Sequence, residues 1–156
     1  MLEVGEVVVA SEQVDAEYKF VVALKAKLDR GVAANAASHL CLGLVAKAAA
    51  ERPELVQRMS FLQFPDASGN DHSPVSGLSL IALEGRPAWL RKLRGEALDS
   101  GLLCTDFTAQ MTGGSYLDQL DRMKQTPESD LDYYGVAVFG TRADVDPLTK
   151  KFSLLR

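Results

Sequence analysis

An unbroken run of apolar residues, FVVAL at 20–24, constrains the fold of this chain more than any other feature. A strand at a sheet surface alternates apolar and polar residues, whereas a strand covered on both faces does not. The run therefore predicts a central strand over 18–25, with helices on both sides of its sheet. Because open α/β sheets bind ligands beyond the carboxyl ends of such strands, we expect a site shortly after residue 25.

A helix is predicted directly after this strand. Residues 32–50 are rich in alanine, a strong helix former, and Pro53 marks the exit. An apolar stripe at four-residue steps faces the core, while Asn35, Ser38 and His39 are spaced i, i+3 and i+4 and so share another face. The chain therefore reads as a buried strand, a short turn and a helix that carries polar groups.

The rest of the chain alternates strands with helices. Strands are predicted at 59–64, 77–83, 102–107, 134–140 and 152–155, and helices over 116–125 and from Pro87 to about residue 100. This order predicts a single α/β domain over 1–156, a three-layer α/β/α structure with a mixed sheet of four to five strands. Residues 1–17 are interpreted as a leader or edge segment, and residues 109–133 as an inserted helix and loop.

Composition narrows the class of protein. With 156 residues, 47% of them apolar, the chain can bury a core without disulfides or metal. Cys41 and Cys104 are too few for a secreted disulfide framework, which predicts reduced thiols and a cytoplasmic location. The formal net charge of −4 makes nucleic acid an unexpected partner. We also expect no membrane partner, because no signal peptide is recognisable and no window reaches transmembrane length.

Common catalytic motifs are absent from the sequence. It contains no nucleophile elbow, phosphate-binding loop, dinucleotide fingerprint or HExxH helix. The two histidines, His39 and His72, do not make a zinc site by themselves, so no metal and no cofactor is predicted.

Three residues are candidates for a catalytic role. His39 lies among small residues of the predicted helix, where a structural and a functional role are equally expected, and Asn35 could fix its tautomer. Asp106 and Thr108 follow a predicted strand, where polar side chains reach the ligand edge of a sheet; the alternative is that they only cap a turn. We predict that His39, Asp106 and Thr108 line one cleft.

Candidate binding residues come from the turn after the first strand. Lys27 and Arg30, together with Lys25, bring positive charge to this point, although surface charges of this kind are usually just solvated. Asn35 and Arg30 are expected at the rim of the cleft. His72, in a Gly-Asn-Asp-His loop, is a further candidate.

These segments together resemble the second, archaeal and eukaryotic type of peptidyl-tRNA hydrolase. In that family a buried strand, a Gly-Lys-Gly-Lys loop and a helix with an Ala-Ala-Gln-Cys-Ser-His segment follow one another. The family's Asp-Ala-Gly-Arg-Thr-Gln loop and final strand come later. The matching stretches here are 19–24, 28–31, 35–39, 106–110, 135–140 and 154–155, so the resemblance covers most of 18–156.

The resemblance implies the fold of that family, but the match in the catalytic residues is incomplete. The lysine that the family uses in catalysis is absent, and Arg30 is a nearby cation of different geometry. The chain looks closer to an uncharacterised bacterial family with the same fold, marked by His72 and by the pair Phe107-Thr108.

We therefore expect a binding domain for a small anionic ligand. The alternative is a hydrolase that acts on an ester or amide, including peptidyl-tRNA, and a third option is an unrelated small-molecule enzyme on the same fold. The resemblance and the apolar residues outside the core pattern, Met59, Phe61 and Trp89, also predict a homodimer.

Overall fold

The strands of the main sheet alternate with helices along the chain, as the sequence predicts. A computed structural model describes residues 16–72 and 74–156. The main sheet contains β1 (Tyr18–Lys25), β4 (Leu80–Gly85), β5 (Leu103–Thr108), β6 (Tyr133–Thr141) and β7 (Ser153–Leu154), while β2 (Phe61–Leu62) and β3 (Val75–Ser76) form a separate hairpin. The helices are α1 (Arg30–Glu51), α2 (Pro53–Arg58), α3 (Pro87–Asp99), α4 (Tyr116–Gln125) and α5 (Arg142–Thr149), with short 3-10 turns η1 (Ala109–Met111) and η2 (Glu128–Asp130). The predicted leader segment lies, apart from residues 16 and 17, outside the described residues.

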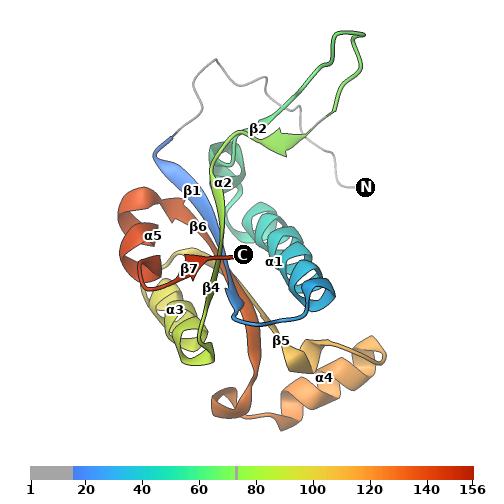
Figure 1. Cartoon of the computed structure of the whole chain (residues 1–156), viewed down its shortest axis with the longest axis vertical. Coiled ribbons are helices and arrows are strands. Elements are labelled where there is room, and N and C mark those ends of the chain that lie inside the picture. Colours follow the sequence, from blue (N-terminus) through green and yellow to red (C-terminus); the bar gives the residue numbers. More distant parts are fainter. Residues whose placement is uncertain (1–15, 73) are drawn as a thin grey trace.

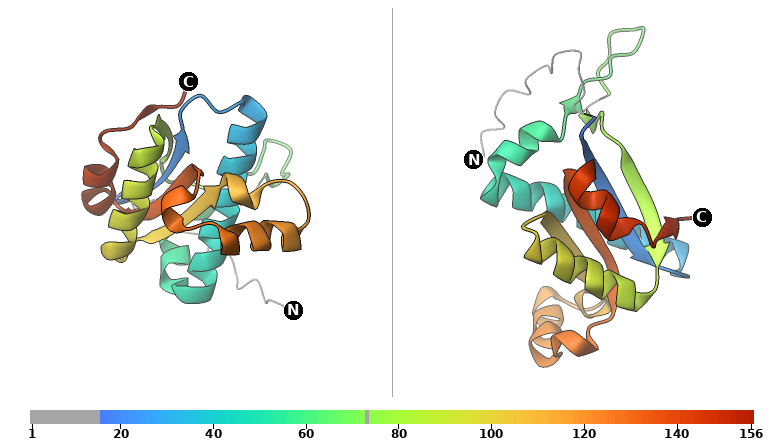
Figure 2. Two further views of the ribbon diagram at one scale, coloured as in Figure 1. Left: turned by 90° about the horizontal axis from the view of Figure 1, so that it is seen from below. Right: turned by 90° about the vertical axis from the view of Figure 1, so that its left-hand side faces the viewer.

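The strand order of the main sheet is β5-β6-β1-β4-β7. β1 lies at its centre and pairs with β4 in parallel and with β6 antiparallel; the two outer pairs are also antiparallel. α1 and α2 cover one face, and α3 and α5 cover the other (Figures 1 and 2). The predicted α/β class, with a mixed five-stranded sheet between helices, is confirmed.

Successive residues of β1 supply the two halves of the core. Phe20, Val22 and Leu24 belong to the apolar cluster formed with α1, whose buried residues are Ala36, Leu40, Leu44 and Ala48. Val21 and Ala23 point to the other face and belong to the cluster formed with α3. Because side chains alternate between the faces of a strand, the unbroken apolar run is what a doubly covered strand requires.

Of the predicted strand at 59–64, only residues 61 and 62 form a strand, β2. β2 is two residues long and pairs with β3 outside the main sheet, and residues 63–72, which follow β2, project away from the body of the molecule (Figure 1). The loop is closed locally by Asp66, whose carboxylate accepts hydrogen bonds from the backbone amides of Ser68 and Asn70. Local turn chemistry therefore determines this hairpin, which the apolar pattern alone does not reveal.

Helix α1 corrects the expectation that no window reaches transmembrane length. It has 22 residues, and its most apolar window has a mean hydropathy of 1.3, enough to cross a membrane by length and composition. However, its buried stripe packs on β1, β5 and β6 as the covering helix of the sheet. A core helix of a globular domain meets the same criteria, so the composition of α1 is accounted for by this packing.

The inserted segment between β5 and β6 begins with η1 and contains α4. The predicted helix over 116–125 is confirmed, and a capping box begins it: Ser115 Oγ accepts from the amide of Asp118 at 3.3 Å, and the Asp118 carboxylate accepts from the amide of Ser115 at 2.8 Å. None of the α4 residues is buried. The insertion therefore lies at the end of the sheet as a covering unit and adds little to the core (Figure 1).

Candidate functional site

The carboxyl ends of β1 and β4 form a switch point in the topology of the sheet. The two strands are parallel neighbours, and the amide of Ala26 donates to the carbonyl of Gly85 at 2.9 Å just beyond them. The chain leaves β1 into α1 on one face and leaves β4 into α3 on the other (Figures 1 and 2). Both helices thus begin at the same end of the sheet, on either side of the place where open α/β sheets bind ligands.

The two helix N-termini at the switch point lack side-chain caps, although the N-cap residue of α1 is Asp29. Neither α1 nor α3 has a side-chain capping hydrogen bond, and neither has an acidic residue in its first turn. The first amides of a helix have no intrahelical acceptor, and the helix dipole adds partial positive charge there. Asp29 and Glu84 also lie at this end, so the local charge is mixed.

Three exposed basic residues surround the switch point. Lys27 has a positive φ of 66°, a left-handed conformation that is unfavourable for residues other than glycine. Arg30 begins α1, and Arg86 is the N-cap residue of α3, with its guanidinium 5.5 Å from the Trp89 ring centroid. Within 16–72 and 74–156, no carboxylate forms an ion pair with these three residues.

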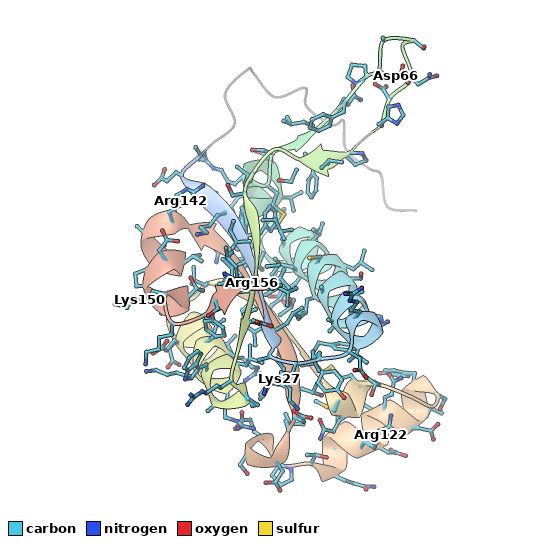
Figure 3. The ribbon with its side chains drawn as sticks, viewed as in Figure 1. Lys27, Asp66, Arg122, Arg142, Lys150 and Arg156 are labelled. Carbon is cyan, nitrogen blue, oxygen red and sulfur yellow. The ribbon has the colours of Figure 1, made fainter. Side chains whose placement is uncertain are left out.

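Arg86 was missed by sequence reasoning. Gly85-Arg86-Pro87 is recognisable as the start of a helix, but nothing local in the sequence reveals that β4 lies beside β1 in parallel. Only that pairing brings the N-terminus of α3 next to the turn that carries Lys27 (Figure 3).

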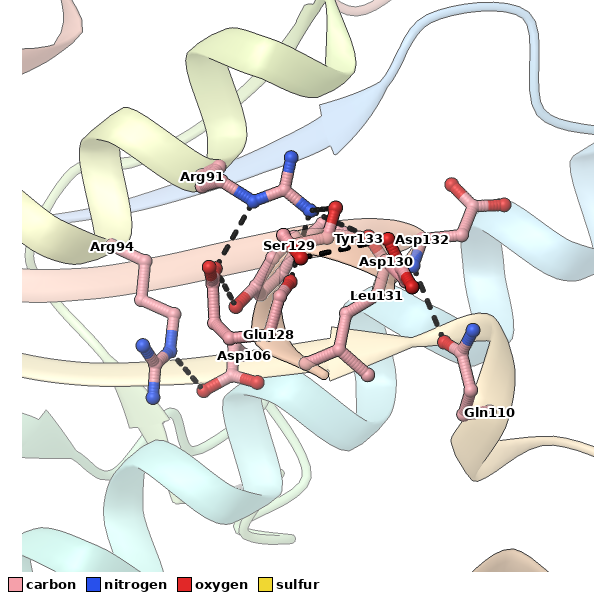
Figure 4. A network of polar contacts seen from close by, with 10 residues as sticks. All are labelled: Arg91, Arg94, Asp106, Gln110, Glu128, Ser129, Asp130, Leu131, Asp132 and Tyr133. Carbon is pink, nitrogen blue, oxygen red and sulfur yellow. Dashed lines mark hydrogen bonds and ion pairs between the residues drawn. The ribbon is translucent and has the colours of Figure 1, made fainter. Parts of the chain in front are cut away.

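Lys25, the last residue of β1, already has a partner. Its ammonium lies 2.9 Å and 3.1 Å from the two carboxylate oxygens of Asp132 and 5.8 Å from the ring centroid of Tyr134. Asp132 is held by η1, because its carbonyl accepts from the amide of Ala109 and its own amide donates to Gln110 Oε1 (Figure 4). The charge of Lys25 is therefore balanced within the chain, unlike that of Lys27 or Arg30.

His39 is exposed on α1 and packs against the end of β5. Its ring is stacked on that of Phe107, with centroids 5.1 Å apart and an interplanar angle of 7°. Asn35 is also exposed, and among the described residues no hydrogen bond joins it to His39. The geometry therefore gives His39 a packing role on one face of its ring and leaves its surroundings polar and accessible.

The prediction that His39, Asp106 and Thr108 line one cleft is wrong. Phe107 faces α1, so Asp106, its neighbour on the strand, points to the opposite face and pairs with Arg94 of α3 at 3.0 Å (Figure 4). Thr108 is fully buried, and its hydroxyl donates to the sulfur of Met123 in α4 at 3.5 Å. Strand alternation and the inserted helix separate the three side chains.

His72 is also separate from the basic residues. It lies in the projecting hairpin, with Nε2 3.0 Å from the Asp66 carboxylate. The hydrogen bonds from His72, Asn70 and Ser68 hold the pKa of Asp66 well below its usual range. Figure 3 shows Asp66 and Lys27 toward opposite ends of the molecule, so His72 belongs to the hairpin and not to the switch point.

A second polar network holds the connection between α4 and β6. Arg91 of α3 donates to the carbonyls of Glu128, Ser129 and Leu131 and to the Glu128 carboxylate (Figure 4). The same carboxylate accepts from the Tyr133 hydroxyl at 3.0 Å, and burial together with this bond raises the pKa of Tyr133 to about 12. Within the described residues, neither this network nor any other place gathers three or more His, Cys, Asp or Glu side chains in a way that could hold a metal.

The fold and the switch point define an α/β domain with a mixed sheet and three exposed basic residues at one end of it. The chain belongs to the family described as protein of unknown function (DUF2000), whose model matches residues 18–156. It is similar to the solved structure of Atu0240, a protein of unknown function from Agrobacterium tumefaciens strain C58, with 20% identity and a TM-score of 0.74 over 90% of this chain and 98% of that one. At this identity the likeness shows the fold. No curated protein matches the sequence.

Proposed function

We propose that this protein binds a small anionic ligand at the switch point between β1 and β4. The observation that carries the proposal is the convergence of two uncapped helix N-termini with three basic side chains that have no carboxylate partner among the described residues. Backbone amides and the helix dipole favour an anion, and Lys27, Arg30 and Arg86 supply full charges around it.

The size of the ligand follows from the charge of the surroundings. Lys25 is neutralised by Asp132, and Asp29 and Glu84 oppose part of the remaining positive charge. A nucleic-acid backbone requires several phosphates to be neutralised at once, which three basic side chains on a chain of net charge −4 do not favour. A single phosphate, diphosphate or carboxylate group matches the three basic side chains better.

Calorimetric titration with inorganic phosphate and pyrophosphate tests the proposal. Replacing Arg30 or Arg86 by Gln should weaken binding about tenfold, the loss of roughly 1.4 kcal/mol expected for one charge-assisted contact. The matched control is Lys92→Gln, because Lys92 is an exposed basic residue of α3 that pairs with Glu96. Equal affinities for the wild type and both variants, or no binding at all, would overturn the proposal.

Lys27→Gly separates binding from folding. Glycine adopts a positive φ without the steric clash that a lysine side chain causes. The variant should therefore unfold at an equal or higher temperature than the wild type, and it should bind phosphate more weakly. A variant that is both less stable and weaker in binding would indicate that Lys27 supports the turn and not the ligand.

The second candidate function is hydrolysis of an ester or amide on a fold like that of the second type of peptidyl-tRNA hydrolase. The order of the matching segments and the accessible His39 support it. We also propose a cytoplasmic location, because Cys41 and Cys104 are free thiols. The pairing of Asp106 with Arg94 and the burial of Thr108 disfavour hydrolysis. Incubation with N-blocked aminoacyl-tRNA decides between them: turnover abolished by Asp106→Asn would favour the hydrolase.

A further inference from the structure

An apolar pocket of about 240 Å³ lies between α1, the β2-β3 hairpin and the start of β4. Its walls come from the sheet, from α1 and from the hairpin, and they include Phe20, Leu80, Cys41, Val45, Phe61 and Val75. Phe20 and Leu80 are paired near the start of their strands, whereas the switch point follows Lys25 and Gly85. These positions are about 17 Å apart along the strands, so the pocket is separate from the proposed anion site.

The walls of the pocket offer nothing to a charged or strongly hydrated molecule. None of the described residues that line it is charged. The Ser76 hydroxyl is already used, because it donates to the carbonyl of Met59 and accepts from the amide of Leu78. Burial raises the pKa of the Cys41 thiol, which is therefore neutral at physiological pH. A stable water needs two to four polar partners, so these walls favour an uncharged apolar molecule over water.

The hairpin wall of the pocket is held in place by the body of the chain. Besides the bond from Ser76 to Met59, the amide of Gly77 donates to the carbonyl of Ser60 at 2.9 Å. Ser60 has a positive φ of 52°, a left-handed conformation that is unfavourable for residues other than glycine. These contacts fix Phe61 and Val75 beside α1. A preformed wall lowers the entropy cost of binding, because less of the protein has to be ordered by the ligand.

The volume of the pocket limits the size of what it can hold. A cavity of about 150 Å³ accommodates benzene. Pockets for drug-sized ligands begin at roughly 300 Å³, above the value found here. Val75 and Leu80 are 53% and 51% exposed, so the pocket is open to solvent on their side.

We propose that this pocket binds a small uncharged apolar ligand, of the size of one aromatic ring or a short alkyl chain. The ligand excludes water from apolar walls that have no free polar group to bind it. The site is independent of the anion site, and the hairpin, which lies outside the main sheet, serves as one of its walls.

A second copy of the chain is a less suitable occupant, although the sequence predicts a homodimer. Of the residues behind that prediction, Met59 is fully buried in the chain's own core, Trp89 packs edge-on against Phe152 and only Phe61 lines the pocket. The exposed face of α1 carries the polar residues Asn35, Ser38 and His39. The apolar surface is therefore confined to a pocket of small-molecule size.

A methyl NMR titration of the whole chain with toluene tests the proposal. The methyl groups of Val45, Val75 and Leu80 should shift and saturate with one common Kd. Cys41→Phe fills the pocket and should abolish the shifts, whereas Leu42→Phe is the matched control, because Leu42 is 71% exposed on α1 and does not line the pocket. Val75→Asp, at an exposed position, should weaken binding by placing a charge beside the ligand. Circular dichroism checks that each variant is folded.

Alkylation of Cys41 by N-ethylmaleimide gives a second measurement on the wild type. Toluene should slow the labelling of Cys41 with the Kd found by NMR and leave that of the buried Cys104 unchanged. Shifts that do not saturate, or equal binding by the variants at positions 41 and 42, would overturn the proposal. So would methyl shifts that depend on protein concentration without toluene, which indicate a second copy in the pocket, or a Cys41 that does not react in the free protein, which indicates that the chain itself fills it.

Discussion

At the scale of single residues, Asp106 is placed to hold the structure together. Its carboxylate accepts from Arg94 Nε at 3.0 Å on the face covered by α3, and both side chains are partly shielded, with exposed fractions of 24% and 33%. Asp106, which the family resemblance suggests as a catalytic residue, therefore links the edge strand β5 to helix α3. His39, by contrast, remains accessible at the other face.

Replacing Asp106 by Asn should lower the free energy of unfolding by about 1 kcal/mol, the value of a partly exposed ion pair. Phosphate affinity should not change, because Asp106 lies outside the switch point. Urea denaturation and calorimetric titration measure the two effects. If the variant lost phosphate binding while its stability was unchanged, Asp106 would belong to the functional site.

Cys104 makes the protein sensitive to alkali. Burial, and then the nearby Asp106, raise the pKa of its thiol to about 11, above the ordinary value of 9.0. Below pH 9 the thiol is protonated in both states; above it the unfolded chain loses the proton first, so stability falls as pH rises toward 11.

The expected loss between pH 9 and 11 is roughly 2 to 3 kcal/mol, at about 1.4 kcal/mol per pKa unit. Thermal unfolding in this range measures it, and Cys104→Ala should flatten the slope while lowering stability at neutral pH through the cavity it creates. If stability falls with pH equally steeply in the wild type and in Cys104→Ala, another group causes the loss. Tyr133 is then the next candidate.

At the scale of elements, the connection over 126–132 is held by one side chain. Arg91 reaches from α3 to three carbonyls and one carboxylate of this segment, which the sequence predicts only as part of an inserted helix and loop. The loop in turn positions Asp132 against Lys25. Arg91 therefore links the inserted unit to the end of β1.

Replacing Arg91 by Ala should raise amide hydrogen exchange over 128–132 and cost roughly 1 to 3 kcal/mol of stability, as expected for lost bonds to a charged group. Lys92→Ala, one residue along α3, is the control. Unchanged exchange in the Arg91 variant would mean that other contacts hold the loop.

Elements with a clear local signal are predictable from the sequence. The apolar run places β1, the alanine-rich segment places α1, and Ser115 with Asp118 places α4, because each signal acts within a few residues. The hairpin is not predictable in this way. The apolar residues around Phe61 suggest a strand of the main sheet, whereas pairing with the distant Val75 decides its place.

At the scale of the whole molecule, the candidate site depends on strand pairing. Lys27 and Arg30 are identifiable from their position after β1. Arg86 joins them only because β4 pairs with β1 in parallel. This pairing brings together residues 60 positions apart in the sequence, such as Phe20 and Leu80. The single cleft predicted for His39, Asp106 and Thr108 fails for a related reason. Which face a strand residue occupies depends on the register of the whole sheet.

The most direct test of the anion site is a titration of the labelled protein with inorganic phosphate, followed by amide chemical shifts. The amides of Gly31, Val32 and Ala88 belong to the first turns of α1 and α3, and we expect them to shift together with one common Kd. Shifts confined to only one of the two helices, or centred on α4 or on the hairpin, would contradict a site at the switch point between β1 and β4.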